Sequence, residues 1–523
     1  MKNFIKYIAP LLVAVSCNDN FSLDGGIRAD IEGNEVRHEM IVLGDQLEDP
    51  YSVENVTKAL DRLYPTRADR TPLEPTDIYV RFLPEDEQEY DDLVGAGLQL
   101  LDHPVDYTIV REGDYYHDPS IDEDKITWQY AVVDKDFEFP EDIHYEVLYE
   151  CYIADHSAST KADGIDWDEV ERLSYELTGN SGMLSPQTKG SSAVPSGRIT
   201  IVDPAAGGEP FGVSGVRVSC NSFVKFDRAY TDKDGYYQME RKFASNPRYR
   251  LVFKNKKGFG IGFNLLFCPA SYSTLGKNSP QGVSIEVSAS SERKLFSRCV
   301  VNNAAYDYYE QCRSGEQTIK TPPGNLRIWL FQNLDRSSAV MMQQGALVDG
   351  SAVGKYLGDY KFLLKMFLPD ITLGLKGSDT YEDIYSVAIH ELAHASHYMQ
   401  VGNDYWDDYI RYILTSFISS GFVTYGVGTG EGYGYCEVGE MWAFYVQTVI
   451  HNERYPDNEV VYGTNYWFYP QIFMYLDDRG LTRYKIFDAL TSDITDRDKL
   501  RKKLISLNTG FKSKINEAFN RYN

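Results

Sequence analysis

Two histidines and a glutamate in the second half of this 523-residue chain have a spacing that can build a metal site. The segment HELAH runs from His390 to His394, within the range 381–400, which contains no Pro or Gly and has apolar residues at helical spacing. On a helix the two imidazoles lie about 40° apart around the axis and about 6 Å apart along it, so both can bind one metal ion. Glu391 lies one step round the helix, where its carboxylate can reach a water bound to that ion.

This arrangement is typical of zinc-dependent hydrolysis. Zinc lowers the pKa of a bound water toward about 7, and a neighbouring carboxylate removes and relays the proton. With nine His in the chain, roughly 0.01 matches to HExxH are expected by chance. The motif therefore predicts that His390 and His394 bind Zn²⁺ and that Glu391 acts as a general base.

A third protein ligand has to come from another part of the chain, because catalytic zinc sites use three ligands and a water. His397 is unsuitable, since a straight helix rises about 10.5 Å between positions 390 and 397, too far for both imidazoles to hold one ion. We therefore expect His397 in the core or in support of the site. A second helix is predicted over 437–452, and it carries Glu437 and Glu440 on one face. Both also suit the start of a helix, where the dipole favours carboxylates, and Glu437 suits it better.

Together these two helices resemble those of the gluzincin branch of zinc metallopeptidases, over roughly residues 320–490. In that family the second helix supplies a glutamate, often within a string like EGxAEY. The string EMWAFY, which begins at Glu440, matches it at the Glu, Ala and Tyr. The resemblance implies that Glu440, rather than Glu437, is the third zinc ligand. It also implies hydrolysis of peptide bonds in a protein or peptide substrate, with Glu391 as the base.

The chain departs from the family pattern in two places. Glu440 follows His394 by 46 residues, a longer separation than in many gluzincins, which implies an insertion around 402–434. Its Gly- and Tyr-rich part, 426–436, is expected to contact substrate. Phe444 stands where some members carry an aspartate that supports a histidine ligand, so the motif does not identify the residue that orients the histidines.

Substrate binding in the resembled family also needs a strand and an oxyanion donor. Its members bind extended peptides along an edge strand through main-chain hydrogen bonds, and the strand predicted at 371–375 fits that role. The oxyanion donor is often a downstream Tyr or His. Four tyrosines are available for it: Tyr462, Tyr466, Tyr469 and Tyr484.

The amino terminus, MKNFIKYIAPLLVAVSC, has two lysines before an apolar run that is too short to span a bilayer. It resembles a bacterial lipoprotein signal, although Ala14 stands where Leu is usual. The resemblance implies removal of residues 1–16 and lipidation of Cys17. The chain would then be exported to the cell envelope, where a lipid anchor at the outer membrane or cell surface is its only membrane contact. The alternative is an ordinary secretory signal.

The formal net charge of −25 argues against binding to nucleic acid or to an anionic membrane surface, because both need a positive field. This charge is unevenly distributed. Residues 18–190 hold 42 acidic and 13 basic side chains, a balance of −29, whereas the residues after 190 carry +2. Such a shift marks a domain boundary.

Pattern and composition predict a multidomain fold with an acidic α+β module, an all-β sandwich of transthyretin-like or Ig-like type, and a mainly α, zincin-like catalytic domain. Short alternating strands around the turn TDKDGYY resemble the carboxypeptidase regulatory-like domain, over roughly 195–285. The predicted limits are 1–16 for the signal peptide, 17–153 for the acidic module, 154–194 for a linker, 195–288 for the sandwich and 289–523 for the catalytic domain.

Six cysteines other than Cys17 are scattered along the chain without a CxxC pair, so the sequence shows no thiolate zinc site. Cys299 and Cys312 are the closest candidates for a disulfide in an exported protein. Free buried thiols are equally compatible with the sequence.

Two other functions compete with the enzyme. One is a binding lipoprotein of the envelope or cell surface that keeps a degenerate zincin domain without turnover. The other is a structural envelope protein in which the HELAH helix is only part of the core. Bound metal and peptide cleavage separate these alternatives from the peptidase.

Overall fold

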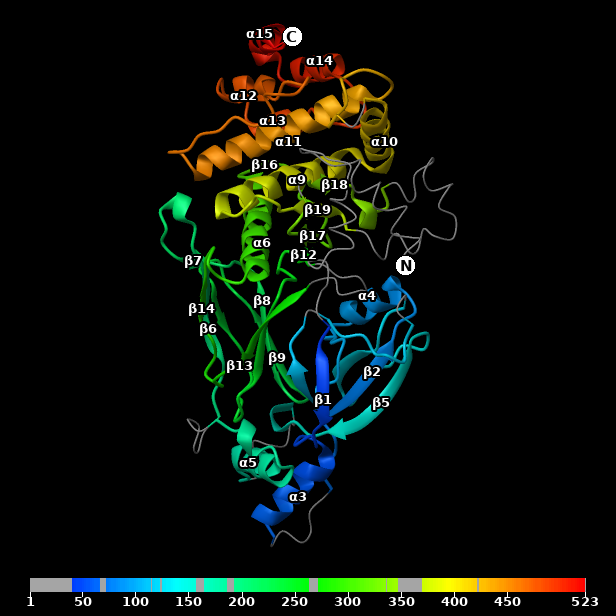
Figure 1. Ribbon diagram of the computed structural model, residues 1–523, viewed down its shortest axis with the longest axis vertical. Coiled ribbons are helices and arrows are strands. Elements are labelled where there is room, and N and C mark those ends of the chain that lie inside the picture. The colour runs from blue at the N-terminus through cyan, green and yellow to red at the C-terminus, as the bar shows by residue number, and fades with distance from the viewer. Residues whose placement is uncertain are drawn as a thin grey trace.

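The computed structural model describes residues 40–65, 72–113, 115–122, 125–156, 164–185, 192–262, 271–334, 336–346, 369–420 and 423–522. The predicted signal segment, Cys17 and Cys268 lie outside these residues. The molecule is elongated, with the helices of the C-terminal unit at the top of Figure 1 and two β-rich units side by side below them. This mixture of helices and sheets in several units agrees with the predicted multidomain fold class. Within the described residues no helix has the length and hydropathy to cross a bilayer.

The N-terminal unit is built on a three-stranded antiparallel sheet with the order β4-β2-β5, beside a separate pair of strands, β1 and β3. The central strand β2 buries Tyr79, Val80 and Phe82 completely. The sequence pattern did not indicate β3 or β5, and seven of the eight β5 residues lack the burial that gives a strand its apolar signal. The bounds are β1 (Val42–Gln46), α3 (Val53–Leu63), β2 (Asp77–Leu83), α4 (Glu87–Gly95), β3 (Tyr107–Arg111), β4 (Gln129–Asp134) and β5 (His144–Cys151).

The segment predicted as a linker contains a packed helix, α5 (Trp167–Leu177). Its Tyr175 is buried, and the Tyr175 hydroxyl lies 2.7 Å from the Ser222 hydroxyl of the next unit. On the same helix Glu171 accepts a hydrogen bond at 2.9 Å from the ammonium of Lys225. These polar contacts attach the N-terminal unit to the middle unit of the chain.

Two four-stranded sheets form the middle unit, one containing β10, β6, β14 and β7 and the other with the order β13-β11-β8-β9. The predicted turn is present: Asp232 Oδ1 accepts from the amides of Asp234 and Tyr236, and Gly235 has a φ of +85° that favours glycine. The bounds are β6 (Ser196–Ile201), β7 (Phe211–Gly212), β8 (Arg217–Ser222), β9 (Lys225–Tyr230), β10 (Tyr236–Gln238), β11 (Arg248–Val252), β13 (Tyr272–Lys277) and β14 (Ile285–Val287).

The C-terminal unit combines a small sheet, with the order β12-β17-β19-β18, and a set of helices. Its strands are β12 (Gly260–Ile261), β17 (Arg327–Phe331), β18 (Ser338–Ala339) and β19 (Ile371–Gly374), and a hairpin of β15 (Arg313–Ser314) and β16 (Gln317–Thr318) follows α6. Its helices are α6 (Arg293–Gln311), α9 (Tyr381–Val401), α10 (Asn403–Ser419), α11 (Tyr433–Arg454), α12 (Gln471–Asp477), α13 (Arg483–Phe487), α14 (Arg497–Leu507) and α15 (Lys512–Arg521).

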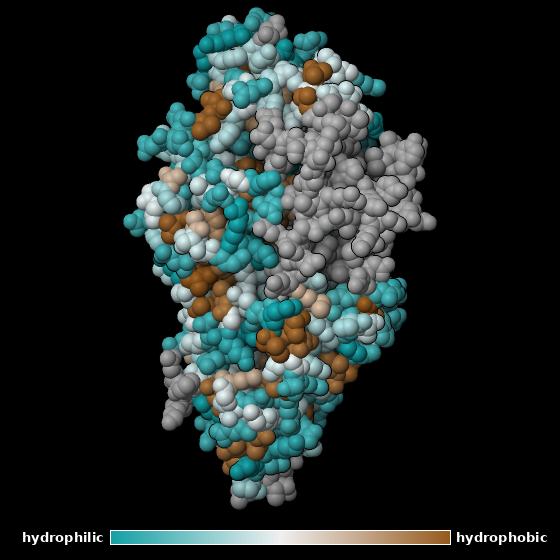
Figure 2. Space-filling view, in the orientation of Figure 1, coloured by the Kyte–Doolittle hydropathy of each residue, from teal (hydrophilic) through white to brown (hydrophobic). Residues whose placement is uncertain are grey.

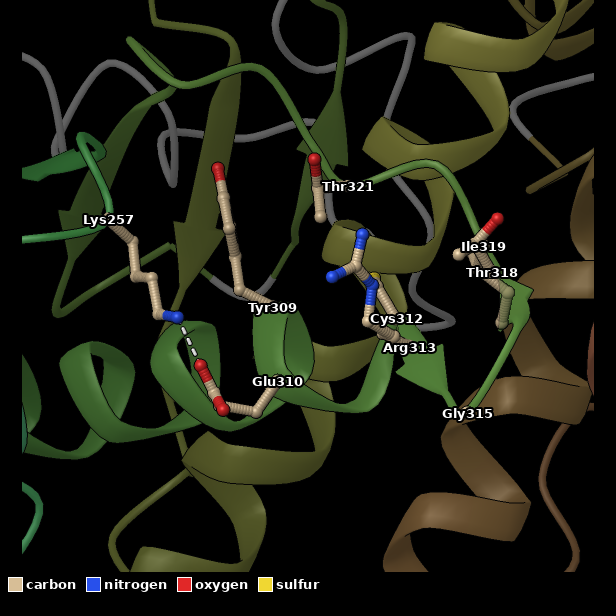
Figure 3. A pocket seen from close by; sticks show the side chains of 9 residues that line it. All are labelled: Lys257, Tyr309, Glu310, Cys312, Arg313, Gly315, Thr318, Ile319 and Thr321. Carbon is tan, nitrogen blue, oxygen red and sulfur yellow. Dashed lines mark hydrogen bonds and ion pairs between the residues drawn. The ribbon is translucent and has the colours of Figure 1, made fainter.

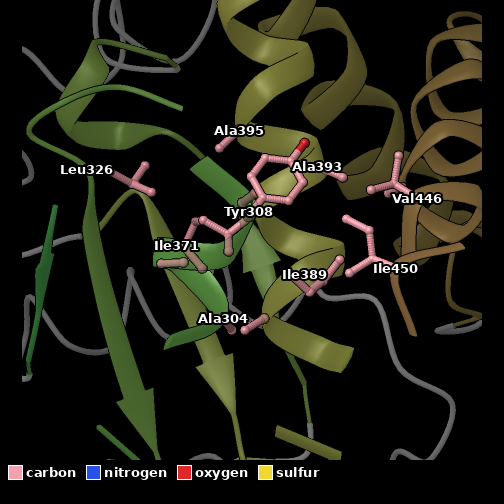
Figure 4. Packing of buried hydrophobic residues seen from close by; sticks show 14 of the residues in the cluster. Ala304, Tyr308, Leu326, Ile371, Ile389, Ala393, Ala395, Val446 and Ile450 are labelled. Carbon is pink, nitrogen blue, oxygen red and sulfur yellow. The ribbon is translucent and has the colours of Figure 1, made fainter. Parts of the chain in front are cut away.

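The middle unit and the C-terminal unit share one hydrophobic core. Strand β12 comes from the segment predicted as sandwich, yet it pairs in parallel with β17 of the C-terminal sheet. One continuous cluster of buried side chains runs from Ile199 in β6 to Phe519 in α15. Figure 4 shows its centre, where side chains from α6, β19, α9 and α11 meet. The helices that carry the candidate ligands are therefore held by packing on several sides.

Strand β19, which contains the predicted ITLGL strand, is not at an edge of its sheet. It pairs in parallel with β17 on one side and antiparallel with β18 on the other. The expectation that this strand offers an edge to an extended peptide is therefore wrong, because both of its hydrogen-bonding sides are occupied.

All five cysteines in the described part of the chain are buried free thiols. Cys299 lies within α6 and Cys312 directly follows the helix. The two cysteines do not form a disulfide.

Candidate metal centre

Helix α9 carries the HELAH segment and is anchored at its start by a capping box. The Thr380 hydroxyl accepts a hydrogen bond from the Asp383 amide at 3.1 Å, and the Asp383 carboxylate accepts one from the Thr380 amide at 3.4 Å. The helix ends at Gly402, which has a φ of +82°. Between these ends it packs against α6 on one side and α11 on the other.

Helix α11 brings the third candidate ligand beside the first two. At its start Gly434 packs against the segment before α14, where a Cβ would lie 2.2 Å from the carbonyl oxygen of Thr495. The indole of Trp442 donates a hydrogen bond at 3.1 Å to the carbonyl oxygen of Ala393 on α9. This contact joins the two helices and sets Glu440 opposite the two histidines.

His390, His394 and Glu440 converge on one point. The two Nε2 atoms are 3.2 Å apart, and each lies 3.5 Å from one oxygen of the Glu440 carboxylate. The three side chains are almost closed off, since the exposed fractions of His390, His394 and Glu440 are 4%, 1% and 0%. Among the described residues they are the group of His, Cys, Asp and Glu whose ligand atoms come close enough to share a metal ion.

The residues present fit a tetrahedral metal ion. Bonds of about 2.0–2.1 Å at tetrahedral angles place neighbouring ligand atoms about 3.3–3.4 Å apart, close to the separations seen here. Glu391, next to His390 in the sequence, has a buried Oε2 without a hydrogen-bond partner. Buried polar atoms of this kind are costly unless something else binds near them. The group could therefore hold a metal ion.

Two neighbours orient the candidate ligands. The Oε1 atom of Gln447 accepts a hydrogen bond at 3.1 Å from Nδ1 of His390, which leaves the lone pair on Nε2 facing the site. The hydroxyl of Tyr409, on α10, donates to Oε1 of Glu440 at 2.5 Å. Neither residue was predicted from the sequence. Gln447 could have been found, because it lies seven positions after Glu440 on the same helix face, whereas nothing in the sequence marks Tyr409.

Opposite charges define the electrostatics of the group. Burial alone would raise the pKa of Glu440, but the two imidazoles hold it well below its usual value. For His394 burial dominates and lowers the pKa. At His390 burial is again the largest single effect, but hydrogen bonds to Glu440 and Gln447 and the charges of Glu391 and Glu440 together raise the pKa. The carboxylate is therefore charged, as a metal ligand has to be.

Glu391 occupies the position expected of a base. It is buried, and burial raises its pKa to about 8, with His390 lowering the value and Glu440 raising it. A bound cation would favour the carboxylate form and lower this pKa. The charges of His390 and Glu440 therefore act on the Glu391 carboxyl, although Glu391 is not one of the three candidate ligands.

His397 lies apart from the metal-binding group. It is fully buried, and its ring packs against Tyr405 and Trp406, with ring centres 5.4 Å and 5.8 Å away. Burial lowers its pKa to about 3, and His394 adds to the effect. The side chain is a neutral member of the aromatic core, in line with the geometric argument from the helix rise.

Glu437 points to a different partner. Its Oε1 lies 3.5 Å from Nε of Arg497, near the start of α14, and burial raises its pKa. The structure therefore brings Glu440, and not Glu437, together with the two histidines.

Of the four tyrosines named as oxyanion donors, Tyr466 is the one that aromatic packing connects to the site. Its ring centre is 5.5 Å from that of Phe444, which is 4.4 Å from that of His390. Tyr484 donates its hydroxyl to the carbonyl oxygen of Gln311. The rings of Tyr462 and Tyr469 instead contact His451 and Arg497.

The predicted substrate loop, 426–436, is shorter than expected because residues 433–436 already belong to α11. The residues before it continue the aromatic surface beside His390. The ring of Tyr425 lies 4.8 Å from Tyr466 and 6.3 Å from Phe444, and its carbonyl accepts from the Trp467 indole. This end of the loop is fixed by packing at the edge of the site.

A hollow of about 660 Å³ lies elsewhere, at the C-terminal end of α6 (Figure 3). Neither histidine ligand nor Glu440 lines it. Its Lys257 is paired with Glu310, the interaction drawn as a dashed line in Figure 3. The residues that could bind a metal therefore do not line this hollow.

Comparison with known proteins adds no family assignment to this geometry: no protein-family model and no curated protein matches the chain.

Proposed function

We propose that the protein is a zinc-dependent metallopeptidase that hydrolyses peptide bonds. The observation that supports this most is the convergence of His390, His394 and Glu440 from two helices at the separations a tetrahedral ion requires. The HExxH spacing on α9 and the partial EGxAEY match on α11 support assignment to the gluzincin branch. The two-sheet middle unit supports a carboxypeptidase regulatory-like module, which serves such enzymes as an accessory support.

In this proposal each residue of the site has a defined task. When bound, zinc supplies a Lewis acid that activates water and polarises the scissile carbonyl. His390, His394 and Glu440 hold the ion, while Gln447 and Tyr409 fix the orientation of two of these ligands.

Glu391 then acts as the general base. Its Oε2 has no hydrogen-bond partner, so it is available to take a proton from water and to deliver it to the leaving amine. Tyr466 is the candidate donor to the oxyanion, because it packs on the Phe444 ring that contacts His390. The ring of Phe444 and the loop that contains Tyr425 provide an apolar wall for the substrate.

We further propose that the chain is exported and anchored by a lipid on Cys17. The sequence of the first 17 residues supports this placement. Labelling with a radioactive fatty acid in the native bacterial host tests it, with Cys17→Ser as the unlabelled control.

The peptidase proposal is tested with the full chain and a diverse peptide library. The Glu391→Gln variant is expected to keep its zinc and to lose turnover, because the ligands are intact and the base is gone. Glu437→Gln is the matched control, since it removes a carboxylate from α11 that is not part of the group. Equal cleavage by wild type and Glu391→Gln, or none by wild type, would contradict the proposal.

One observation favours a second function, that of a binding lipoprotein with a degenerate site. The candidate ligands are almost fully buried, and closed metal sites are typical of structural rather than catalytic zinc. That function predicts retained zinc without cleavage of any peptide, and tight binding to an envelope or host partner.

A further inference from the structure

A cavity of about 340 Å³ lies between the N-terminal unit and the middle unit. One wall comes from β3 and the residues just before it, and the other from β11, β13 and the turn after β8. Figure 1 shows the sheet that carries β9 and β13 next to β1 of the N-terminal unit. This cavity is separate from the metal-binding group, none of whose residues lines it.

The cavity collects positive charge in a chain whose net charge is −25. Arg248, Arg250 and Lys277 line it, and no acidic side chain is among its described lining residues. Arg248 is paired with Glu112 at the rim. No carboxylate in the described part of the chain forms an ion pair with Arg250 or Lys277. Lys277 therefore has no carboxylate partner there, and the charge of Arg250 is offset only by Asp102 and Glu112, which raise its pKa without forming an ion pair with it.

Arg250 is the buried part of this cluster. It is only 4% exposed, and its guanidinium donates to Oδ1 of Asn221 at 2.6 Å and to Nε2 of His103 at 3.3 Å. Nδ1 of His103 in turn contacts Asp102 at 2.7 Å, which makes the imidazole an acceptor toward the arginine. These neutral acceptors fix the orientation of the guanidinium and leave its charge for another partner. Burying an arginine without an anion is costly.

The strand register brings like charges together. Arg248 on β11 is directly opposite Lys277 on β13, and Arg250 lies two residues further along β11 on the same face. Like charges opposite each other destabilise a sheet, and Arg248 lowers the pKa of Lys277 in addition to the effect of burial. An anion bound next to the Arg248 and Lys277 side chains would remove this repulsion.

The hollow beside α6 differs from this cavity, because an acidic side chain is part of its lining. There Lys257 has Glu310 as its partner within the same hollow (Figure 3). The interdomain cavity has no such acid. Its remaining lining combines hydrogen-bonding groups such as Asn246 and Ser222 with apolar side chains such as Val105 and Phe223.

We propose that this cavity binds a small organic anion, with its phosphate or carboxylate group held by Arg248, Arg250 and Lys277 and its remainder against Val105 and Phe223. A guanidinium fork and an ammonium group are the donors that such oxyanions prefer. The volume suits one small molecule rather than a polymer. Because the two walls belong to different units, the ligand also stabilises their docking.

Calorimetric titration of the full chain with inorganic phosphate and with citrate tests the proposal, using sodium chloride at equal ionic strength as the blank. The two probes separate a phosphate site from a carboxylate site. We expect at least one of them to bind with a Kd below about 1 mM. The Lys277→Gln variant is expected to weaken that affinity about tenfold, and Lys277→Glu further, since the second change reverses the charge.

Lys233→Glu is the matched control, because Lys233 is exposed and lies in a turn away from the cavity. It makes the same change in net charge and is expected to leave the affinity within about twofold of wild type. Binding of neither probe above the chloride blank would overturn the proposal. Equal affinities of wild type and Lys277→Glu would also overturn it, since Lys277 is exposed and its replacement leaves the fold intact.

Discussion

The metal-binding group and the interdomain cavity are both polar clusters with an unbalanced charge, but the protein builds them differently. The group on α9 and α11 lies inside one continuous core, where the ligand atoms of two imidazoles and a carboxylate lie 3.2–3.5 Å apart. The cavity lies between two units. Its like charges, Arg248 and Lys277, lie opposite each other on neighbouring strands of one sheet. The first is rigid because packing surrounds it, whereas the second depends on how two units dock. The difference implies that the two sites respond to separate ligands and to separate mutations.

The largest effect should come from removing a candidate metal ligand. His394→Ala deletes one of three ligands, so zinc affinity should fall at least about a thousandfold and peptide cleavage should be lost. Citrate or phosphate binding at the cavity should be unchanged, because the sites share no residue. Competition with a chromogenic zinc chelator measures the first result, and titration calorimetry measures the second. A parallel loss at both sites would mean that the variant is unfolded or that the sites are coupled.

The residue that orients His390 should have the next largest effect. Gln447→Leu removes the acceptor for Nδ1 but no ligand, and loss of such a partner costs about 10–100-fold in metal affinity. Chelator competition at several pH values checks this result. Leucine is close to glutamine in volume, so the melting temperature with zinc in excess should change little. Unchanged zinc affinity in this variant would show that Gln447 only fills space.

A third prediction concerns the pH dependence of the stability of the N-terminal unit. Asp49 is buried beside Tyr51 and Tyr149, and burial raises its pKa from 3.8 to about 7. Between these values the folded state binds more protons than the unfolded state. The free energy of unfolding should therefore fall as the pH rises from about 4 to 7, and this contribution is absent above that range.

Urea unfolding followed by tryptophan fluorescence at pH 5 and pH 8 measures this trend. Asp49→Asn keeps an oxygen acceptor for Tyr149 but cannot ionise, so the difference in stability between the two pH values should shrink. The same difference in wild type and variant would assign the pH dependence to other buried carboxyls, such as Asp307 and Asp370, whose pKa values are raised to about 6.

The smallest effect should be a gain in stability. Lys277→Gln removes the repulsion across from Arg248, so without added anion the variant should be more stable than wild type by about 0.5 kcal/mol. With saturating anion the order should reverse, because wild type then gains the binding free energy. Urea midpoints with and without citrate measure both results. A variant that is less stable in every buffer would contradict the repulsion argument.

The sequence predicts much of the metal-binding group because its information is local. The spacing of His390 and His394 fixes their relation on any helix, and the amphipathic pattern of the second helix places Glu440 on a face that can meet them. The register between α9 and α11 is different, because it depends on tertiary contacts such as the hydrogen bond from Trp442 to Ala393. Tyr409 reaches Glu440 from α10, and no pattern along the chain reveals that contact.

The sheets were harder to anticipate for the same reason. Strand β5 has little buried surface and hence a weak apolar pattern, and β19 was expected at an edge because its pairing with the two-residue strand β18 is set by a distant segment. The cavity is also non-local. Arg248, Arg250 and Lys277 are ordinary residues in the sequence, and only the strand register and the docked N-terminal unit bring them together around one volume.

The central claim, that three side chains from two helices bind one zinc ion, is tested most directly by an anomalous difference map. Crystals of the full chain grown with zinc should be measured on both sides of the zinc edge. We predict a single strong peak about 2.0–2.2 Å from Nε2 of His390, Nε2 of His394 and a carboxylate oxygen of Glu440. A zinc-free site between these residues, or a peak held by other ligands, would contradict the account.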